Sequence, residues 1–294
     1  MFVYLNNKLV PSAEAKVSVF DHGFLYGDGI YETMRVYEGV VFQVDEHLKR
    51  LRRSASLIGL DVPKSDDDIK ASVYETLIAN TLSDAYLRLT ISRGYGEIGL
   101  DPDLCKEPTF IIIAQKFKSY PRSYYEEGIS LKIASVRRNL IEALNPQIKS
   151  LNFLNNILAK IEARKAGANE AIMLNASGHL AEGTISNIFF LRDGVLNTPS
   201  IGCGILDGIT RSLVIDLAAK NSILVKEGEF VPEDLLGASE VFITNSTMEV
   251  MPVSKVDEKT FKAGETAALL LAKYKKEVTG YVREKKEEAP SLWE

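Results

Sequence analysis

The fold is decided by a stretch in the middle of the chain, which reads Ile148-Lys149-Ser150-Leu151-Asn152-Phe153-Leu154-Asn155-Asn156-Ile157-Leu158-Ala159-Lys160-Ile161-Glu162-Ala163. Four of its apolar side chains, Leu151, Leu154, Leu158 and Ile161, recur at the spacing of one helical face, and Ile157 lies beside them. The pattern predicts an amphipathic helix that buries this face.

The predicted helix has signals at both ends. Ser150 or Asn152 would cap its start, and Gly167 would end it. Lys149 stands just before the first turn, beside the apolar face. Burial disfavours the charged form of an amine, which suits a lysine for bonding an aldehyde. Spacing alone favours a simpler interpretation, in which the lysine stem covers apolar surface and its charge stays in water.

Composition narrows the class of protein. The chain has 294 residues, 46% of them hydrophobic, and a net charge of -5, as expected for a globular protein with one large or two modest domains. No basic block points to nucleic acid. We expect a cytoplasmic protein without a membrane partner, because no leader or membrane-spanning apolar stretch is evident. Two cysteines, Cys105 and Cys203, fit a reducing compartment.

The order of elements predicts an α+β fold. The first half shows strands within residues 2–44, helices at 46–58 (capped by Asp45) and 65–80, and strands at 85–92 and 109–115. The second half shows strands at 129–136, 171–175, 187–191, 194–196, 240–244 and 250–253, with helices at 208–221 and 263–281. We predict an N-terminal domain (1–118), a polar linker around Pro121 (119–127) and a C-terminal domain (128–294), with the site between the two domains. The tail from Glu284 is expected to be loose.

Several common kinds of site do not fit the sequence. Residues 94–99 match Gly-x-Gly-x-x-Gly, but Leu100-Asp101-Pro102 follows where a dinucleotide fold needs a helix. A flexible loop at the mouth of a pocket fits better. The three histidines show no metal-ligand spacing, so no metal is expected. Lysine, arginine, carboxylate and tyrosine remain, and they suit a cofactor that supplies its own electronics.

The motif Lys-Ser-Leu-Asn-x-Leu at 149–154, followed by Leu-Ala-Lys-x-Glu-Ala at 158–163, resembles the cofactor-lysine segment of the fold-type IV pyridoxal-phosphate enzymes. Branched-chain aminotransferases, D-amino acid aminotransferases and aminodeoxychorismate lyases form this family. The resemblance covers roughly residues 1–280. It implies pyridoxal 5′-phosphate as the cofactor, Lys149 rather than Lys160 as the catalytic Schiff-base lysine, and a homodimer.

The resemblance also indicates which residues would bind the phosphate of the cofactor. Arg50 aligns with the family's phosphate-binding arginine, and a guanidinium fork can donate two parallel hydrogen bonds to a phosphate. Its neighbours Lys49, Arg52 and Arg53 are expected to form a solvated face. Gly208-Ile209-Thr210 resembles the family's phosphate turn at a helix start, where Ile209 and Thr210 would bind. An ordinary helix start would give the same pattern.

Two further cofactor contacts follow from the resemblance. Ser246 stands where relatives often carry a phosphate-binding threonine. Glu182 corresponds to the carboxylate that pairs with the protonated pyridine nitrogen and keeps the ring able to accept electrons. An isolated glutamate is more often a surface residue.

On the substrate side, Tyr31 and Arg35 lie in the N-terminal motif, and Tyr86 and Arg88 match a Tyr-x-Arg strand of the branched-chain enzymes. These side chains, with the turn at Thr247, would hold the α-carboxylate. A cross-strand pair on a sheet face is the alternative explanation of Tyr86 and Arg88.

Some features depart from the branched-chain pattern. Tyr31, Thr33 and Phe153 replace commoner residues and lean toward the D-amino acid branch. That branch, however, needs an arginine and a histidine in the 94–102 loop, which has neither. We therefore expect transamination between branched-chain L-amino acids and 2-oxoglutarate. A D-amino acid aminotransferase and an aminodeoxychorismate lyase are the alternatives.

Overall fold

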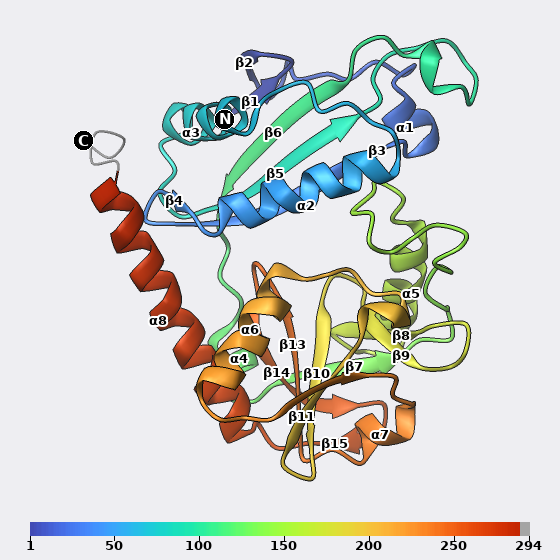
Figure 1. Cartoon of the computed structure of the whole chain (residues 1–294), viewed down its shortest axis with the longest axis vertical. Coiled ribbons are helices and arrows are strands. Elements are labelled where there is room, and N and C mark those ends of the chain that lie inside the picture. The colour runs from blue at the N-terminus through green and yellow to red at the C-terminus, as the bar shows by residue number, and fades with distance from the viewer. Residues whose placement is uncertain (289–294) are drawn as a thin grey trace. The chain divides into compact units, whose positions relative to one another are not determined.

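A computed structural model describes residues 1–288 and divides the chain into two compact units (Figure 1). The first unit contains Met1–Lys118, Ile148–Asn152 and the residues from Val278 onward, and the second contains Ser119–Gln147 and Phe153–Glu277. The first boundary coincides with the expected end of the N-terminal domain. The segment around Lys149 differs from expectation, because it groups with the first unit and not with the C-terminal part of the chain.

The first unit is built on a six-stranded antiparallel sheet in the order β2-β1-β6-β5-β3-β4. Its strands are β1 (Phe2–Leu5), β2 (Lys8–Pro11), β3 (Gly29–Tyr37), β4 (Val40–Val41), β5 (Ala85–Ser92) and β6 (Thr109–Lys116). Its helices are α1 (His22–Tyr26), α2 (Val44–Leu57) and α3 (Asp66–Ala79), with a 3₁₀ turn at Pro102–Leu104.

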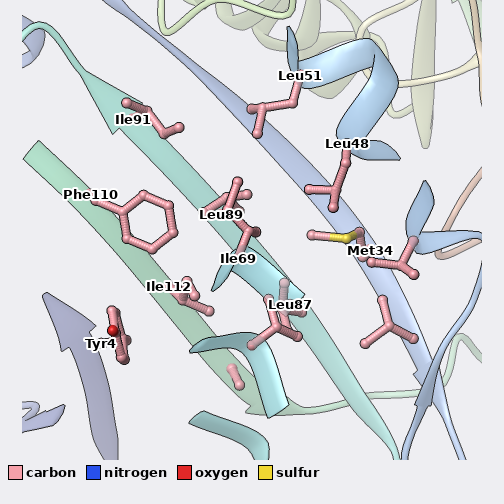
Figure 2. Packing of buried hydrophobic residues seen from close by; sticks show 14 of the residues in the cluster. Tyr4, Met34, Leu48, Leu51, Ile69, Leu87, Leu89, Ile91, Phe110 and Ile112 are labelled. Atoms are coloured by element: carbon pink, nitrogen blue, oxygen red, sulfur yellow. The ribbon is translucent and has the colours of Figure 1, made fainter. Parts of the chain in front are cut away.

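Alternation along the central strands separates an apolar face from a polar face. Every second residue of β5, including Leu87 and Leu89, is fully buried. Figure 2 shows these side chains packed with Met34 of β3 and with Leu48 and Leu51 of α2 in one apolar cluster. The period of two along the strands and the i, i+3 spacing on the helix bring these residues together. The opposite face of β3 and β5 is left to polar side chains.

The second unit is built on a nine-stranded sheet in the order β12-β11-β10-β13-β14-β7-β8-β9, with β15 paired to β14. Three of its pairings, β11–β12, β14–β7 and β7–β8, are parallel, and the others are antiparallel. The strands are β7 (Ile129–Ile133), β8 (Glu170–Leu174), β9 (Leu180–Gly183), β10 (Asn187–Arg192), β11 (Val195–Pro199), β12 (Val225–Gly228), β13 (Glu240–Asn245), β14 (Glu249–Val256) and β15 (Lys259–Thr260).

The helices that accompany this second sheet are α4 (Arg122–Glu126), α5 (Leu154–Lys165), α6 (Ile209–Lys220) and α7 (Pro232–Leu236), with a 3₁₀ turn at Ile201–Cys203. The long helix α8 (Glu265–Glu288) contributes residues to both units, since the division falls at Val278. Both units combine helices with sheets, as an α+β fold requires.

Helix α5 corrects the prediction for the central stretch. It begins at Leu154, after Phe153, and no side chain caps it. The expected buried face is wrong, because Leu154, Ile157, Leu158 and Ile161 are between 43% and 68% exposed. The buried side chains are Asn156, Ala159 and Ala163, and the two alanines pack with Ala134, Ala171 and Met173. Small side chains let the helix approach the sheet closely, so the bulky residues face away from it.

Other local predictions divide between confirmed and wrong. Ser65 caps α3 by accepting a hydrogen bond from Asp68 N, close to the expected start. Asp45 does not cap α2, which begins one residue earlier, after Gln43. The expected linker contains α4. Residues 284–288 belong to α8 and are not loose, whereas 289–294 lie outside the described residues. Within residues 1–288, no helix has the length and apolarity needed to cross a bilayer.

Candidate functional site

Lys149 lies in an irregular segment beside β3, not at the start of a helix. Its carbonyl oxygen accepts a hydrogen bond from Tyr31 N at 2.9 Å, and its own N–H donates to Ser54 Oγ at 3.2 Å. The next residue, Ser150, forms a bridge with Ile30. The backbone is therefore held on both sides of the lysine. Pairing with β3 explains why this segment belongs to the first unit.

The Lys149 side chain meets Tyr31. Its Nζ donates to the Tyr31 hydroxyl at 3.3 Å and lies 4.4 Å from the centre of the ring. The guanidinium carbon of Arg88 lies 3.8 Å from the same ring centre. Burial raises the pKa of Tyr31 well above its usual range, although Arg88 acts in the opposite direction. The phenol is thus neutral at pH 7 and is in contact with an amine and a guanidinium.

Arg88 and Tyr86 share the polar face of the sheet with Tyr31. In the antiparallel register of β3 and β5, Tyr31 is opposite Thr90 and Thr33 is opposite Arg88. Arg88 Nε donates to Thr90 Oγ1 at 3.2 Å, and the Tyr86 and Thr33 hydroxyls lie 3.4 Å apart. Three of the expected substrate residues therefore lie on one face with Lys149.

Arg35 lies on the same face, opposite Tyr86, but its guanidinium has other partners. Its guanidinium donates to the carbonyl oxygens of Val36 and Ala85 and to the carboxylate of Asp84. It also stacks on the ring of Phe117, 3.7 Å from the ring centre. It lies four positions along β3 from Tyr31, roughly 13 Å. The structure thus gives the Arg35 guanidinium partners within the protein, and its contact with substrate stays a prediction.

Arg50 is paired with a carboxylate that the sequence did not single out. Its Nε and Nη2 donate to the two oxygens of Glu32 at 2.8 and 2.7 Å. His47 Nδ1 lies 2.7 Å from the same carboxylate and donates to it. Lys49 and Arg53 of the same helix are exposed, as expected. Nε and Nη2 of Arg50 therefore bind Glu32, whereas the sequence led us to expect that the guanidinium binds the cofactor phosphate.

The protonation of this cluster follows from its burial. Burial alone would raise the pKa of Glu32, but the charge and hydrogen bonds of Arg50, together with the hydrogen bond from His47, hold it well below its usual range. Burial lowers the pKa of His47, partly opposed by its hydrogen bond with Glu32. Glu32 is thus ionised and His47 neutral at pH 7. The pattern Ile-x-Glu-x-Met at 30–34 places one acid on an apolar strand face, a signal that could have identified Glu32.

In the second unit, Glu182 is buried on β9 and is not a surface residue. Arg138 Nε donates to its Oε1 at 2.9 Å. Its Oε2 accepts from Leu206 N at 3.0 Å and from Asn187 Nδ2 at 3.4 Å. A carboxylate held by three donors is ready to meet a cationic partner. Arg138 carries no sequence signal, since it lies in an irregular segment between β7 and α5.

The start of α6 adjoins this cluster. Gly208 precedes Ile209 and Thr210, and no side chain caps the helix. A Cβ atom at Gly208 would lie 1.9 Å from Asn187 Oδ1, so only glycine fits beside that amide. Thr244, paired with Asn187 across β10 and β13, has a buried hydroxyl without a partner among the described residues. Uncapped N–H groups and an orphaned hydroxyl suit an anion such as a phosphate.

The turn between β13 and β14 carries Ser246 and Thr247. Asn245 Oδ1 accepts hydrogen bonds from Thr247 N at 2.9 Å, Thr247 Oγ1 at 3.0 Å and Met248 N at 2.7 Å. The Thr247 N–H, one of the backbone donors expected to meet a carboxylate, is therefore directed to a side chain of the same turn. Ser246, within the turn, is partly buried.

The 94–102 loop makes hydrogen bonds to side chains of α1. His22 Nε2 lies 2.9 Å from Glu97 O, and Gly99 N donates to the Tyr26 hydroxyl at 3.2 Å. A dinucleotide site would require an α-helix directly after the glycines, and only the 3₁₀ turn at Pro102–Leu104 lies between them and β6. Among residues 1–288, no group of histidine, cysteine, aspartate or glutamate is arranged to hold a metal ion. Cys105 and Cys203 are free thiols.

Comparison with known proteins identifies the family. The profile of the amino-transferase class IV family matches residues 29–256. A provisionally named branched-chain-amino-acid aminotransferase of Methanocaldococcus jannaschii is 45% identical over 278 residues, 94% of this chain and 96% of that protein. An aminodeoxychorismate lyase of Bacillus subtilis is 36% identical over 287 residues, 96% of this chain and 97% of the lyase.

A solved structure agrees with these matches. The branched-chain amino acid aminotransferase of T.th. with pyridoxamine 5′-phosphate superimposes with a TM-score of 0.91 at 31% identity, covering 95% of this chain and 94% of that one. The chain therefore belongs to the class IV amino-transferases: it is a fold-type IV aminotransferase with pyridoxal 5′-phosphate as its cofactor, and it resembles the branched-chain enzymes.

Proposed function

We propose that this enzyme transfers the amino group between branched-chain L-amino acids and 2-oxoglutarate, with Lys149 as the catalytic residue. One observation carries the proposal: the ring of Tyr31 is in contact with both the Lys149 amine and the Arg88 guanidinium. The first group suits bonding to an aldehyde, and the second suits binding a carboxylate. Transamination of an amino acid needs both.

The side chains of each unit fit the cofactor. In the first unit, Arg50 would bind its phosphate and Lys149 would bond its aldehyde carbon. In the second, Ile209, Thr210 and Ser246 would hold the phosphate, and Glu182 would pair with the ring nitrogen. The orphaned hydroxyl of Thr244 and the uncapped start of α6 support this assignment. When bound, pyridoxal 5′-phosphate acts as an electron sink for the substrate Cα.

Lys149 would then move the proton. Its Nζ would accept the proton from the substrate Cα as general base and release it, in the same half-reaction, to the aldehyde carbon (C4′) of the cofactor as general acid. The second half of the ping-pong cycle would run these transfers in reverse with the 2-oxo acid. The Tyr31 hydroxyl lies 3.3 Å from Nζ and keeps the amine oriented. Because burial raises the Tyr31 pKa, the phenol can hydrogen bond to the amine without losing its own proton.

Arg88 and Tyr86 would fix the α-carboxylate. Both lie on the polar face of β5, and Arg88 already contacts the tyrosine that meets Lys149. Thr247 would contribute less, since its N–H and hydroxyl both bind Asn245. Substrate would be held chiefly by these two side chains, which leaves its aliphatic part to apolar contacts.

The preference for L-amino acids rests on what the 94–102 loop lacks. It contains no arginine or histidine. Arg93, just before it, is bound to Asp28 at 2.8 Å and to the carbonyl oxygens of Ile58 and Gly59. His22 binds the loop backbone. Both side chains are thus engaged by groups of the protein, and neither supplies the loop arginine and histidine that the D-amino acid enzymes would need. A D-amino acid aminotransferase and an aminodeoxychorismate lyase remain the alternative activities.

A substrate panel tests the proposal. L-Leucine, L-isoleucine, L-valine and D-alanine are each offered with 2-oxoglutarate and with pyruvate, and aminodeoxychorismate is assayed for release of pyruvate. We expect the three L-amino acids with 2-oxoglutarate to react fastest and to differ among themselves by no more than about 10–200-fold. Faster turnover of D-alanine, or pyruvate release from aminodeoxychorismate as the main activity, would overturn the substrate assignment.

We also propose that the enzyme is a homodimer, which the resemblance to the family implies. The exposed apolar side chains of α5, namely Leu154, Ile157, Leu158 and Ile161, support an association of this kind. Contiguous apolar surface often marks a protein contact. Light scattering should give twice the mass of one chain, and a monomer at assay concentrations would contradict the proposal.

A further inference from the structure

Arg138 occupies a defined place next to Glu182. Its backbone N–H donates to Leu174 O on β8 at 2.8 Å, and the neighbouring carbonyl oxygen of Arg137 accepts from Asn155 Nδ2 at 2.7 Å. From this anchored backbone, the guanidinium reaches Glu182 Oε1 with Nε and Asn155 Oδ1 with Nη1, the latter at 3.4 Å. The arginine is thus fixed at its backbone and at two nitrogens.

Burial makes this contact more than a surface ion pair. The Arg138 and Glu182 side chains are only 10% and 7% exposed. A buried carboxylate without a counter-charge tends to take up a proton and become neutral. Two further contacts to Glu182, from a backbone N–H and an amide, come from uncharged donors. Arg138 brings a positive charge into direct contact with the carboxylate, which favours the ionised form.

We propose that Arg138 is a positioning residue, which holds the Glu182 carboxylate ionised and in one orientation for the ring nitrogen of the cofactor. This inference rests on the proposed function, in which Glu182 pairs with that nitrogen. A neutral Glu182 would lose its attraction for a protonated ring, and a rotated one would lose its alignment. Arg138 acts through Glu182 and needs no contact with substrate.

Cofactor analogues separate this role from a general structural one. In 1-deazapyridoxal 5′-phosphate a carbon replaces the ring nitrogen, so the analogue keeps every other contact but cannot pair with Glu182. Apo forms of wild type, Arg138→Gln, Arg138→Lys and Glu182→Gln are titrated with pyridoxal 5′-phosphate and with the analogue. The ratio of the two dissociation constants measures the pairing at the nitrogen and does not depend on turnover.

Wild type should prefer the natural cofactor. In Arg138→Gln the preference should fall by roughly tenfold or more, the range of one charge-assisted hydrogen bond, while affinity for the analogue changes little. Arg138→Lys keeps the charge but loses the planar donor, so its preference should fall less. The double variant, with both Arg138→Gln and Glu182→Gln, should lose no more of this preference than Glu182→Gln alone.

Arg137→Gln is the matched control. It removes the same charge one residue away, from a side chain that is exposed, and should leave the preference at the wild-type value. Thermal melting of each apo protein shows whether it is folded. If Arg138→Gln does not fold, Arg138→Lys supplies the test, and an unchanged preference there would overturn the proposal.

The outcomes distinguish two failures. If Arg138→Gln weakens both ligands equally, or keeps the wild-type preference while Glu182→Gln loses it, Arg138 is not a positioning residue and Glu182 keeps its role. If Glu182→Gln itself keeps the wild-type preference, the assignment of Glu182 in the proposed function fails, and the inference about Arg138 fails with it.

Discussion

Each unit contains a buried carboxylate paired with an arginine, and the two pairs are built in opposite ways. Glu32 is completely buried, and Arg50 gives it two parallel hydrogen bonds while His47 adds a third. Glu182 retains slight exposure and receives one hydrogen bond from Arg138, with its second oxygen on Leu206 N and Asn187.

On the basis of this difference, we assign one partner of each pair to contact with the cofactor. Glu32 is enclosed and cannot reach a ligand, so it serves to hold Arg50, which we assign to the cofactor phosphate. At the other pair the carboxylate is assigned to the ligand, and the arginine holds it. Removing one partner of a buried pair leaves an uncompensated charge and is strongly destabilising. A buried charged group that binds a ligand therefore needs a fixed opposite charge in contact with it.

The largest effect is expected at Lys149. Lys149→Ala should lower kcat by roughly 10⁴-fold, the upper end of what general acid–base catalysis contributes, and borohydride should no longer fix the cofactor to the chain. Lys160→Ala is the control, since Lys160 is exposed and bonds to Asn169 O. Mass spectrometry of the reduced protein locates the attachment, and a label on Lys160 would refute the assignment of Lys149.

The enclosed pair should matter most for stability. Glu32→Gln leaves Arg50 buried without a counter-charge and should lower the free energy of unfolding by about 3–5 kcal/mol. Urea denaturation of the apo protein measures this change. Glu126→Gln, which breaks the exposed pair with Arg122, should leave the unfolding midpoint nearly unchanged. Equal effects of the two substitutions would remove the distinction between an enclosed and an exposed pair.

The carboxylate of the second unit should matter more for rate than for stability. Glu182→Gln keeps a hydrogen-bonding side chain of similar shape but loses the negative charge facing the ring nitrogen. We expect kcat to fall by about 10²–10³-fold, as when a group that stabilises developing charge is removed, while the urea midpoint falls less than in Glu32→Gln, because Glu182 and Arg138 both retain slight exposure. A loss of stability as large as that of Glu32→Gln would show that the two pairs do the same job.

The two arginines on one sheet face give a smaller contrast. Arg88→Ala should raise KM for the amino acid and the 2-oxo acid together by about 10–100-fold, the range of a charged hydrogen bond, and leave the absorbance of bound cofactor intact. Arg35→Ala should lower stability and leave KM unchanged, because Arg35 binds Asp84 and the strand edge. Steady-state kinetics with both variants gives the two KM values. A rise in KM for Arg35→Ala would show that Arg35 does contact the substrate.

The smallest effect is expected in the pH dependence of stability. Glu32 is bound by a titratable side chain, His47, whereas the corresponding side chain at Glu182 is the amide of Asn187, which does not titrate. Both Glu32 and His47 have lowered pKa values, so the unfolded chain binds protons that the folded chain does not. The free energy of unfolding then rises with pH across each window. Between pH 7 and pH 5 the loss on acidification from His47 should reach at most about 1.4 kcal/mol per pH unit.

His47→Gln should abolish this slope between pH 7 and pH 5, while the further loss from Glu32, below about pH 4.3, should persist. Urea denaturation at a series of pH values measures both windows. A slope that survives in His47→Gln would assign the titration to another group.

Short-range pattern in the sequence determined much of the fold. Runs rich in β-branched residues predicted β5 and β6 nearly to their ends, and Ser65 marked the start of α3, because these signals depend on neighbouring residues alone. Motif resemblance singled out Lys149, and the structure places it in contact with Tyr31, which also meets Arg88. Local pattern was sufficient for the secondary-structure elements, whereas spacing alone favoured a simpler role for this lysine.

Only the tertiary structure decided which surfaces and partners those elements use. The bulky face of α5 is exposed because alanines on its other side fit closely against the sheet, a choice that depends on residues far away in the sequence. Lys149 is held by β3, more than 110 residues earlier, and not by a helix start. Arg35 is diverted to Asp84, and Glu182 depends on Arg138, which no motif marks. Buried charges must be matched in space, and the linear sequence does not show which opposite charge will be near.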